Sequence, residues 1–479
     1  MKRLKRECPL TSPVKVVQFG EGNFLRAFVD WMIDEMNQKA DFDAAVRIIQ
    51  PLPSGMGETL NEQGGVYTLV MRGVENGKIL EKIRKIECVK DCLNPYTDWE
   101  KVVETFRGKA LRFCFSNTTE AGIEYKAEPF REGGTQETFP AKLTSLLHER
   151  FLAGLPGLIF LPCELIEHNG SSLKAAMARY AADWKFGEDF AAYLEKENVF
   201  CNTLVDRIVA GYPNCEAPEI WERLGYEDRL LDCSEPFHFF VIEAPVSVEK
   251  ELPFAKAGLN VVFVADQSPY RTRKVRFLNG AHTSSVLAAY LAGFDYVDEM
   301  VADAAFGKFL KKLLFEEIFT TVALPDAEKT QFAEAVLERF ANPFAMHRLL
   351  SISLNSVAKW KVRVLPSLLD YTAAQGKLPP LLSFSLAALI AFYENRGGAG
   401  VNRVNAYPVS DDAAILEFFE QTWSERKDDY AAIADTVLRE SSFWGMDLRS
   451  VSGLAEATAE NLKNIKASGI RLALAGLLK

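Results

Sequence analysis

Apolar and polar positions in the first half of the chain alternate between two kinds of pattern. Runs rich in β-branched and aromatic residues predict strands at 14–20, 44–50, 110–117 and 158–164. Longer stretches with a 3.6-residue period predict helices at 24–38, 98–106 and 139–154. Residues 67–74 and 78–89 predict a pair of antiparallel strands. Strands that alternate with helices form parallel sheets, so the pattern predicts an α/β fold with a doubly wound sheet.

The pattern changes after about residue 270, where nearly every segment has a helical period, as in 302–318. The run 381–393 is apolar throughout but too short to cross a bilayer, which predicts a buried core helix. We therefore predict a dinucleotide-binding domain of the Rossmann type over residues 1–255. A mostly α-helical substrate and catalytic domain over 256–479 follows it. The boundary falls between about residues 245 and 270, and the strand-like run 261–266 lies just before the junction.

Composition narrows the classes of function. The 65 acidic residues outnumber the 55 basic ones and give a net charge of −10, which argues against a nucleic-acid-binding protein. The basic N-terminus lacks the apolar run of a secretory signal. Among the eight cysteines, Cys88 and Cys92 have three residues between them, but no second pair has zinc-ligand spacing, which argues against a metal site. We expect reduced thiols in a cytoplasmic protein without a metal or a membrane anchor. The histidines show no HExxH motif, which disfavours a zinc hydrolase.

A glycine-containing turn joins the first predicted strand to the first predicted helix. Gly20 and Gly22 in this turn let the backbone approach a pyrophosphate, whose charge the helix N-terminus stabilises. Leu25 occupies the place of the usual third glycine, so a plain strand-to-helix turn remains an alternative. The candidate cofactor residues of this turn are Phe19, Gly20, Glu21, Gly22, Asn23 and Phe24.

Two further segments are candidates for the cofactor site. The second strand ends at Gln50, where NAD-binding domains usually carry an acid for the adenosine ribose. Gln50 is able to hydrogen-bond the ribose, and the lack of an immediate basic residue favours NAD over NADP; a polar turn residue before Pro51 is the alternative. Ser116, Asn117 and Thr118 follow a predicted strand and either line the cofactor cleft or cap a helix.

The strongest candidate for chemistry lies near residue 275. If that segment is helical, Asn279 and His282 share one face, and Lys274 lies near the start of the same face. A desolvated lysine can transfer a hydroxyl proton, an amide can stabilise a developing alkoxide, and a histidine can orient hydroxyls. The spacing alone is equally compatible with an exposed lysine, a capping asparagine and a core histidine.

The run Lys274-x4-Asn279-x2-His282 resembles the signature of the polyol-specific long-chain dehydrogenases, the mannitol dehydrogenase family. Residues 16–28 resemble that family's cofactor turn, G-x-G-x-F-x-R. Residues 202–207 resemble its N-x-M-V-D-R-I stretch, and residues 342–359 resemble its N-P…K segment. These similarities cover most of the chain in the right order.

Within the family, the chain most resembles the branch of tagaturonate reductases, also called altronate oxidoreductases. The similar stretches are QFGEGNFLRAF, QPLPSG, PCELIEHNG, PYRTRKVRFLNGAHT and SLNSVAKWKVRVLP. The resemblance implies NAD-dependent, metal-independent hydride transfer between D-altronate and D-tagaturonate in hexuronate catabolism. Fructuronate reductases (D-mannonate oxidoreductases) and mannitol-type polyol dehydrogenases are the alternatives within the family. A non-catalytic nucleotide-binding sensor is the alternative outside it.

The resemblance also implies a role for individual residues. Lys274 matches the family's general acid/base, and Asn279 matches an amide that stabilises the oxyanion. His282 matches a histidine that orients the substrate, Asp206 an aspartate that supports the site, and Lys359 a lysine that contacts the substrate.

Three positions depart from the polyol-dehydrogenase pattern. Leu165 replaces an amide that helps to stabilise the oxyanion, so either Asn169 substitutes for it or one donor is missing. Arg271 replaces an acid, and Ser351 replaces an arginine. A uronate carries a carboxylate that a polyol lacks, and a partly buried anion needs a cation. The candidates for binding it are Arg271, Arg273, Arg348, Lys359, Lys361 and Arg363.

Overall fold

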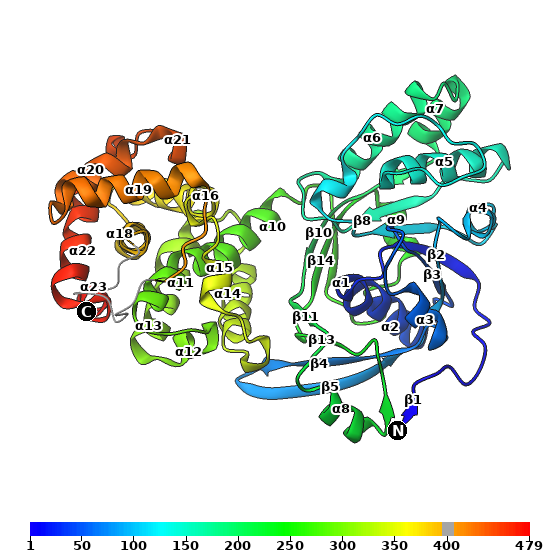
Figure 1. The fold of residues 1–479 in the computed structure, drawn as a ribbon, viewed down its shortest axis with the longest axis horizontal. Helices are drawn as coiled ribbons and strands as arrows, with labels where there is room; N and C mark the ends of the chain where they lie inside the picture. Colours follow the sequence, from blue (N-terminus) through cyan, green and yellow to red (C-terminus); the bar gives the residue numbers. More distant parts are fainter. Residues whose placement is uncertain (395–406) are drawn as a thin grey trace. The chain divides into compact units, whose positions relative to one another are not determined.

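The structure is a computed structural model that describes residues 1–394 and 407–479 (Figure 1). It divides into two compact units, of which the first comprises residues 1–73 and 79–267 and the second comprises 74–78 and 268–479. Strand β15 (Val261–Val264) corresponds to the strand-like run 261–266, and it belongs to the first unit because it pairs in parallel with β14 (Phe239–Glu243).

A six-stranded parallel sheet is the centre of the first unit, with strand order β6-β3-β2-β7-β8-β9. Its strands are β2 (Val14–Phe19), β3 (Ala45–Ile49), β6 (Val89–Leu93), β7 (Phe113–Ser116), β8 (Ile159–Pro162) and β9 (Val199–Phe200). From β2 the chain adds β3 on one side and β7 on the other, both parallel to it. This order confirms the predicted doubly wound sheet, and β2 and β7 form its switch point.

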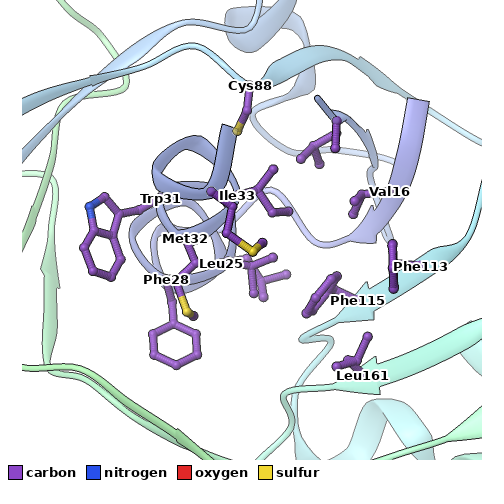
Figure 2. Close-up of a cluster of buried hydrophobic side chains, with 14 of the residues drawn as sticks. Val16, Leu25, Phe28, Trp31, Met32, Ile33, Cys88, Phe113, Phe115 and Leu161 are labelled. Atoms are coloured by element: carbon purple, nitrogen blue, oxygen red, sulfur yellow. The ribbon is translucent and has the colours of Figure 1, made fainter. Parts of the chain in front are cut away.

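Successive residues on these strands point to opposite faces of the sheet and enter two separate cores. Val16 belongs to one core and Val17 to the other. Figure 2 shows the first core, in which Val16, Phe113, Phe115 and Leu161 of the sheet lie near Leu25, Phe28, Met32 and Ile33. The latter come from one continuous helical segment, made of α1 (Asn23–Leu25), the π-helix η1 (Arg26–Asp30) and α2 (Trp31–Lys39). The second core is covered by α4 (Trp99–Phe106), α5 (Phe139–Leu152), α6 (Asn169–Asp183) and α7 (Glu188–Lys196).

Smaller sheets complete the first unit. One has the order β11-β13-β4-β5, with β11 (Val209–Gly211), β13 (Asp232–Ser234), β4 (Tyr67–Glu75) and β5 (Lys78–Ile86). The predicted strand pair at 67–74 and 78–89 corresponds to β4 and β5, which are neighbours there. Another has the order β10-β14-β15, with β10 spanning Asn202–Asp206. The remaining elements are β1 (Lys2–Arg3), β12 (Tyr226–Glu227), α3 (Gly57–Glu62), η2 (Glu120–Ile123), α8 (Ala217–Leu224) and α9 (Val246–Glu251).

Between residues 268 and 394 and between 407 and 479, the regular elements of the second unit are helices, as predicted. Its first helical segment runs through α10 (Ser268–Arg273), the π-helix η3 (Lys274–Gly280) and α11 (Ala281–Leu291). The other elements that carry the argument are α14 (Asp326–Phe340), α15 (Leu349–Ile352), α16 (Ser356–Arg363) and α18 (Pro380–Phe392). The rest are α12 (Val297–Ala302), α13 (Ala304–Lys312), η4 (Leu313–Ile318), η5 (Phe319–Thr321), η6 (Pro343–Ala345), α17 (Leu365–Gln375), α19 (Ala413–Arg426), α20 (Tyr430–Arg439), α21 (Ser441–Trp444), η7 (Leu448–Ser450), α22 (Leu454–Ser468) and α23 (Ile470–Leu477).

Helix α18 is the centre of the second unit. Every residue of it after Pro380 is buried, and it packs against α11 and α22. This confirms the core helix predicted from the apolar run 381–393. In the part of the chain that the structure describes, no helix has the length and apolarity needed to cross a bilayer.

Phe28 tests how strongly the first core stabilises the helical segment that follows β2. Its ring is fully buried and contacts the rings of Phe24 and Phe240. We expect Phe28→Ala to lower the free energy of unfolding by about 3–5 kcal/mol, because the core cannot refill the vacated volume. Urea denaturation followed by circular dichroism measures this. Leu152→Ala, at a largely exposed position, should change it by less than about 0.5 kcal/mol.

Candidate active site

The two glycines of the turn after β2 play different parts. Gly20 has a φ of +121°, and a Cβ built on it would lie 3.0 Å from the carbonyl oxygen of Asn117, which follows β7. Only glycine fits there without strain. A Cβ on Gly22 would have no atom within 4 Å, and the helical segment begins at the next residue, Asn23. The turn therefore presents open backbone at a helix N-terminus, which suits a pyrophosphate group.

Arg26 holds this turn in place, and sequence reasoning did not single it out. Its side chain is 1 % exposed. Its Nε donates to the carbonyl oxygen of Glu21 at 3.1 Å and its Nη2 to Oδ1 of Asn23 at 2.6 Å. Its Nη1 donates to the carbonyl oxygen of Leu230 at 2.6 Å, just before β13. The arginine at the end of the G-x-G-x-F-x-R stretch therefore ties both sides of the turn to another part of the first unit.

The π-helix η1 offers backbone carbonyls to side chains from other strands. The hydroxyl of Tyr67 donates to the carbonyl oxygen of Arg26 at 2.9 Å and to the carboxylate of Asp30 at 3.0 Å. Arg207 Nη1 donates to the carbonyl oxygen of Ala27 at 2.6 Å. Burial raises the pKa of Asp30 to about 7 despite the hydrogen bond from Tyr67. The hydrogen bond to Ala27 gives Arg207, the last residue of the stretch 202–207, a structural role.

Asp206 and Gln50 lie at strand ends of the first unit. Asp206 is the last residue of β10 and is 4 % exposed. Gln50 follows β3, donates from Nε2 to the carbonyl oxygen of Leu52 at 2.7 Å, and accepts from the Gly57 amide at 3.2 Å. The Gln50 side chain therefore shapes the loop that follows its strand.

A cavity of 540 Å³ lies beside Gln50, where the adenosine ribose is expected. Its lining includes the carboxylates of Glu58, Glu62 and Asp98, and among the described residues that line it there is no lysine or arginine. A 2′-phosphate would meet like charge there, which supports the choice of NAD.

Ser116 and Thr118 are joined to the end of β8 by the buried carboxylate of Glu164. It accepts from the Ser116 hydroxyl at 3.1 Å, from the Thr118 amide at 2.9 Å and from the Thr118 hydroxyl at 3.1 Å. Burial raises the pKa of Glu164, and these bonds oppose that shift. Asn117 Nδ2 donates to the carbonyl oxygen of Cys163 at 3.1 Å. The backbone of the segment 116–118 lies against the glycine turn, since the carbonyl oxygen of Asn117 would be 3.0 Å from a Cβ on Gly20.

Asn169 has a structural role in place of the expected one at the substrate. It is fully buried, and its Nδ2 lies 3.0 Å from the Pro162 carbonyl oxygen and 3.1 Å from those of Glu164 and Thr203. Its Oδ1 accepts from the amide of Thr203 at 2.8 Å. These partners use both amide hydrogens, so Asn169 does not replace the donor that Leu165 lacks. Leu165 itself is 59 % exposed.

In the second unit, Lys274 and Asn279 are the first and sixth residues of the π-helix η3. A π-helix bonds residue i to residue i+5, so two residues five apart lie about one turn apart. The spacing Lys-x4-Asn is therefore one π-helical turn, whereas an α-helix would place the two side chains on different parts of its surface. The predicted helix is confirmed, and its π form accounts for a spacing that the α-helical rule explained poorly.

His282 lies at the start of α11, is buried, and has aromatic rings as neighbours. Its ring stacks on Phe340 with centroids 3.9 Å apart and meets His347 edge to face at 5.3 Å. Burial lowers the pKa of His282 well below its usual value, and the charges of His347, Arg339 and Arg363 lower it further. Its Nε2 is buried and has no hydrogen-bond partner among the described residues. A neutral imidazole with an unused nitrogen suits hydrogen bonding to a substrate.

The basic candidates of the second unit differ in their surroundings. Arg273 is buried, packs on the ring of Phe332 at 4.3 Å and lies 3.8 Å from the carboxylate of Glu328. Arg348 is exposed and lies over the ring of Tyr296 at 5.6 Å, and Arg271 is partly buried.

Lys359 and Lys361 both lie on α16. Lys359 Nζ donates to the carbonyl oxygen of Ile352 at 2.9 Å, and its pKa is lowered by burial and then by the nearby charge of Arg363, while Asp411 raises it. Lys361 points to the region of Gly445, where a Cβ would come within 3.2 Å of its side chain.

No group of three or more metal-ligating side chains occurs within residues 1–394 and 407–479.

Comparison with known proteins decides the family. Residues 14–256 match the mannitol dehydrogenase Rossmann domain, and residues 266–466 match the mannitol dehydrogenase C-terminal domain. The chain belongs to the mannitol dehydrogenase family. The family predicted from the sequence is thus confirmed, and the two matched domains follow the same order as the two units of the structure.

Curated relatives cover nearly the whole chain. An altronate oxidoreductase of Pectobacterium atrosepticum is 45 % identical over 472 residues, which are 97 % of each chain. Altronate oxidoreductases of Yersinia enterocolitica and Escherichia coli are 44 % and 43 % identical, over 98 % and 96 % of each chain.

Solved structures of the family share the fold at low sequence identity. A ternary complex of Pseudomonas fluorescens mannitol 2-dehydrogenase with NAD and D-mannitol has a TM-score of 0.70 at 19 % identity, over 99 % of this chain and 96 % of that one. A D-sorbitol dehydrogenase in substrate-free form has a TM-score of 0.82 at 20 % identity, over 98 % of this chain and 100 % of that one.

The two glycines of the turn provide a paired prediction. We expect Gly20→Ala to lower the melting temperature, because it combines a positive φ with a close contact to the Asn117 backbone. Gly22→Ala should leave the melting temperature nearly unchanged but raise the Kd for NADH, because its methyl group projects into open space above the helix start. Thermal melts and NADH fluorescence titrations measure the two effects. An unchanged Kd in Gly22→Ala would contradict the assigned pyrophosphate site.

The acidic cavity beside Gln50 predicts cofactor choice. We expect kcat/KM to be at least about tenfold higher with NADH than with NADPH, which corresponds to 1.4 kcal/mol of discrimination. Glu58→Arg should raise kcat/KM with NADPH, because it places a cation at the cavity lining. Glu104→Arg, at an exposed position of α4 outside the cavity, should not. Equal efficiency of the native protein with both cofactors would exclude this explanation.

Proposed function

We propose that the chain interconverts D-altronate and D-tagaturonate with NAD as its cofactor. The observation that carries this proposal is the 45 % identity to a curated altronate oxidoreductase over 97 % of both chains. Membership of the mannitol dehydrogenase family makes the chain an NAD-dependent oxidoreductase. The names of the curated relatives favour a small sugar acid over a neutral polyol as the substrate.

The first unit would hold the dinucleotide. The open backbone above Gly22 and the helix start at Asn23 fit a pyrophosphate, and the acidic cavity beside Gln50 fits a ribose with free hydroxyls. The full set that we assign to the cofactor is Phe19, Gly20, Glu21, Gly22, Asn23, Phe24, Gln50, Ser116, Asn117 and Thr118. The nicotinamide ring supplies or accepts the hydride when the cofactor is bound.

Residues of the second unit would handle the substrate oxygen. Reduction of a ketone to an alcohol requires a proton on oxygen, and we assign its transfer to Nζ of Lys274. The amide of Asn279, one π-helical turn later, donates a hydrogen bond to the oxygen while negative charge develops on it. His282, which is neutral because burial lowers its pKa, orients a substrate hydroxyl through Nε2. We assign a supporting role to the buried Asp206.

The biological setting is part of the same proposal. We place the chain in hexuronate catabolism, where it acts on a small anionic metabolite, and we expect no nucleic acid, membrane or metal as a partner. All eight cysteines are free in the structure, which suits the reducing conditions of the cytoplasm.

The substrate is tested by assaying NADH oxidation with tagaturonate, fructuronate and fructose in parallel. We expect the highest kcat/KM with tagaturonate. A higher value with fructuronate would identify the mannonate branch, and a higher value with fructose would identify a polyol dehydrogenase. Tight NADH binding without turnover of any of these would instead support a nucleotide sensor.

Lys274→Ala tests the proton-transfer role. We expect kcat to fall by roughly 10²–10⁴, which is the usual contribution of a positioned acid or base. The Kd for NADH should be retained, because the assigned dinucleotide residues lie in the first unit. Near-normal turnover in Lys274→Ala, together with loss of activity in His282→Ala, would move the proton-transfer role to His282.

A further inference from the structure

Two cations of the second unit share one face of helix α16. Lys359 and Arg363 are four residues apart, so their side chains are neighbours on the helix surface. Both are partly buried. Helix α16 packs against η3 and α11, the elements that carry Asn279 and His282. The packing is close, since a Cβ built on Gly280 would lie 2.9 Å from the carbonyl oxygen of Arg363.

Within the part of the chain that the structure describes, no carboxylate lies within ion-pair distance of either cation, although the more distant charge of Asp411 acts on Lys359. The guanidinium of Arg363 makes no hydrogen bond to a described residue, and burial is the one influence on its pKa. Two other partly buried arginines of this unit are paired, Arg276 with Asp370 at 2.6 Å and Arg471 with Asp303 at 2.8 Å. Burial lowers the pKa of Arg363. Two adjacent, partly desolvated positive charges disfavour each other, as the effect of Arg363 on the pKa of Lys359 shows, and an anionic ligand would relieve this.

His282 adds an independent observation at the same place. Its buried Nε2 lacks a partner among the described residues, although buried polar atoms are normally hydrogen-bonded. The charge of Arg363 lies close enough to lower the pKa of His282. The cluster therefore offers a planar guanidinium, an ammonium and a neutral imidazole nitrogen. This set matches a carboxylate that is attached to a hydroxylated carbon chain.

We propose that Arg363, assisted by Lys359, binds the substrate carboxylate and so selects uronates over neutral ketohexoses. This inference rests on the proposed function, and it identifies one arginine among the candidates from the sequence. Arg273 lies near Glu328 and packs against Phe332, and Arg348 is exposed over Tyr296. Arg363 combines burial, proximity to the catalytic π-helix and an unused guanidinium, and its fork binds a carboxylate in two places.

The test compares Arg363→Met with the native protein on tagaturonate and on a neutral ketohexose such as fructose. We expect kcat/KM for tagaturonate to fall about 10–100-fold, mostly through KM, because a charge-assisted bond to the substrate is lost. The value for fructose should change less than about threefold, so the ratio between the two substrates collapses. Arg363→Lys keeps the charge but loses the two-pronged geometry, and should give an intermediate ratio.

Controls separate this role from loss of folding and from cofactor binding. Lys377→Met removes an exposed charge from the same unit and should leave both substrates unaffected. The melting temperature and the Kd for NADH should be retained in Arg363→Met, and a raised Kd would assign Arg363 to a cofactor phosphate and overturn the proposal. An unchanged substrate ratio would overturn it as well. If the native protein does not reduce tagaturonate at all, the proposed function fails instead.

Discussion

The buried guanidinium of Arg26 is the interaction on which the cofactor half of the molecule depends. A charge this far from water is tolerated only when its donors are satisfied. Arg26 meets this condition with oxygens from Glu21, Asn23 and Leu230, and it lies 3.5 Å from the carboxylate of Asp232. Burial raises the pKa of Asp232 to about 7, and the charge of Arg26 opposes this shift. The geometry of the glycine turn is therefore determined by a residue that has no need to contact the ligand.

Both candidate half-sites contain a π-helical turn directly at the functional residues. In η1 the turn follows the glycines, and its carbonyls at Arg26 and Ala27 receive bonds from Tyr67 and Arg207. In η3 the turn brings Lys274 and Asn279 about one turn apart. A π-turn widens the helix and leaves backbone oxygens that other side chains must satisfy. Arg207 therefore has a structural role, because it donates a hydrogen bond to a backbone oxygen of η1.

The fold could be predicted from the sequence because its signals are local and repeated. Val16 and Val17 alternate between two cores, and the apolar run at 381–393 has the length of a buried helix. The strand-like run at 261–266 is a local signal as well and corresponds to β15, but its parallel pairing with β14 is a contact between strands that the sequence pattern does not reveal.

The candidate site was predictable only as far as residue type and spacing reveal chemistry. Residue type and spacing singled out Lys274, Asn279 and His282 as candidates, and the family resemblance suggested their roles, but neither predicted the π-turn that relates the first two. From the sequence, Asn169 was a candidate donor to the substrate, because an asparagine reads the same whether its amide is free or already bonded. Only the three carbonyl oxygens around its Nδ2 show that the amide is already bonded. For Arg363 the structure strengthened a candidate role instead of removing it. Arg363 was one of six basic candidates in the sequence, and the lack of a described counter-ion beside it became visible only when α16 was placed against η3 and α11.

The net charge of −10 does not show how charge is distributed between the cofactor cavity and the proposed substrate site. The cavity beside Gln50 is lined by Glu58, Glu62 and Asp98, so it suits the neutral ribose of NAD and disfavours an added phosphate. The face of α16 that carries Lys359 and Arg363 has the opposite character, with two cations that have no described carboxylate within ion-pair distance. An acidic protein that handles an acidic substrate must keep its own carboxylates away from the position of that anion. A uronate and a ketohexose present similar hydroxyls, so the cation that meets the carboxylate is the group best able to distinguish them. When a neutral sugar is bound, that cation stays buried and unpaired, and this costs more free energy than the loss of one hydroxyl contact.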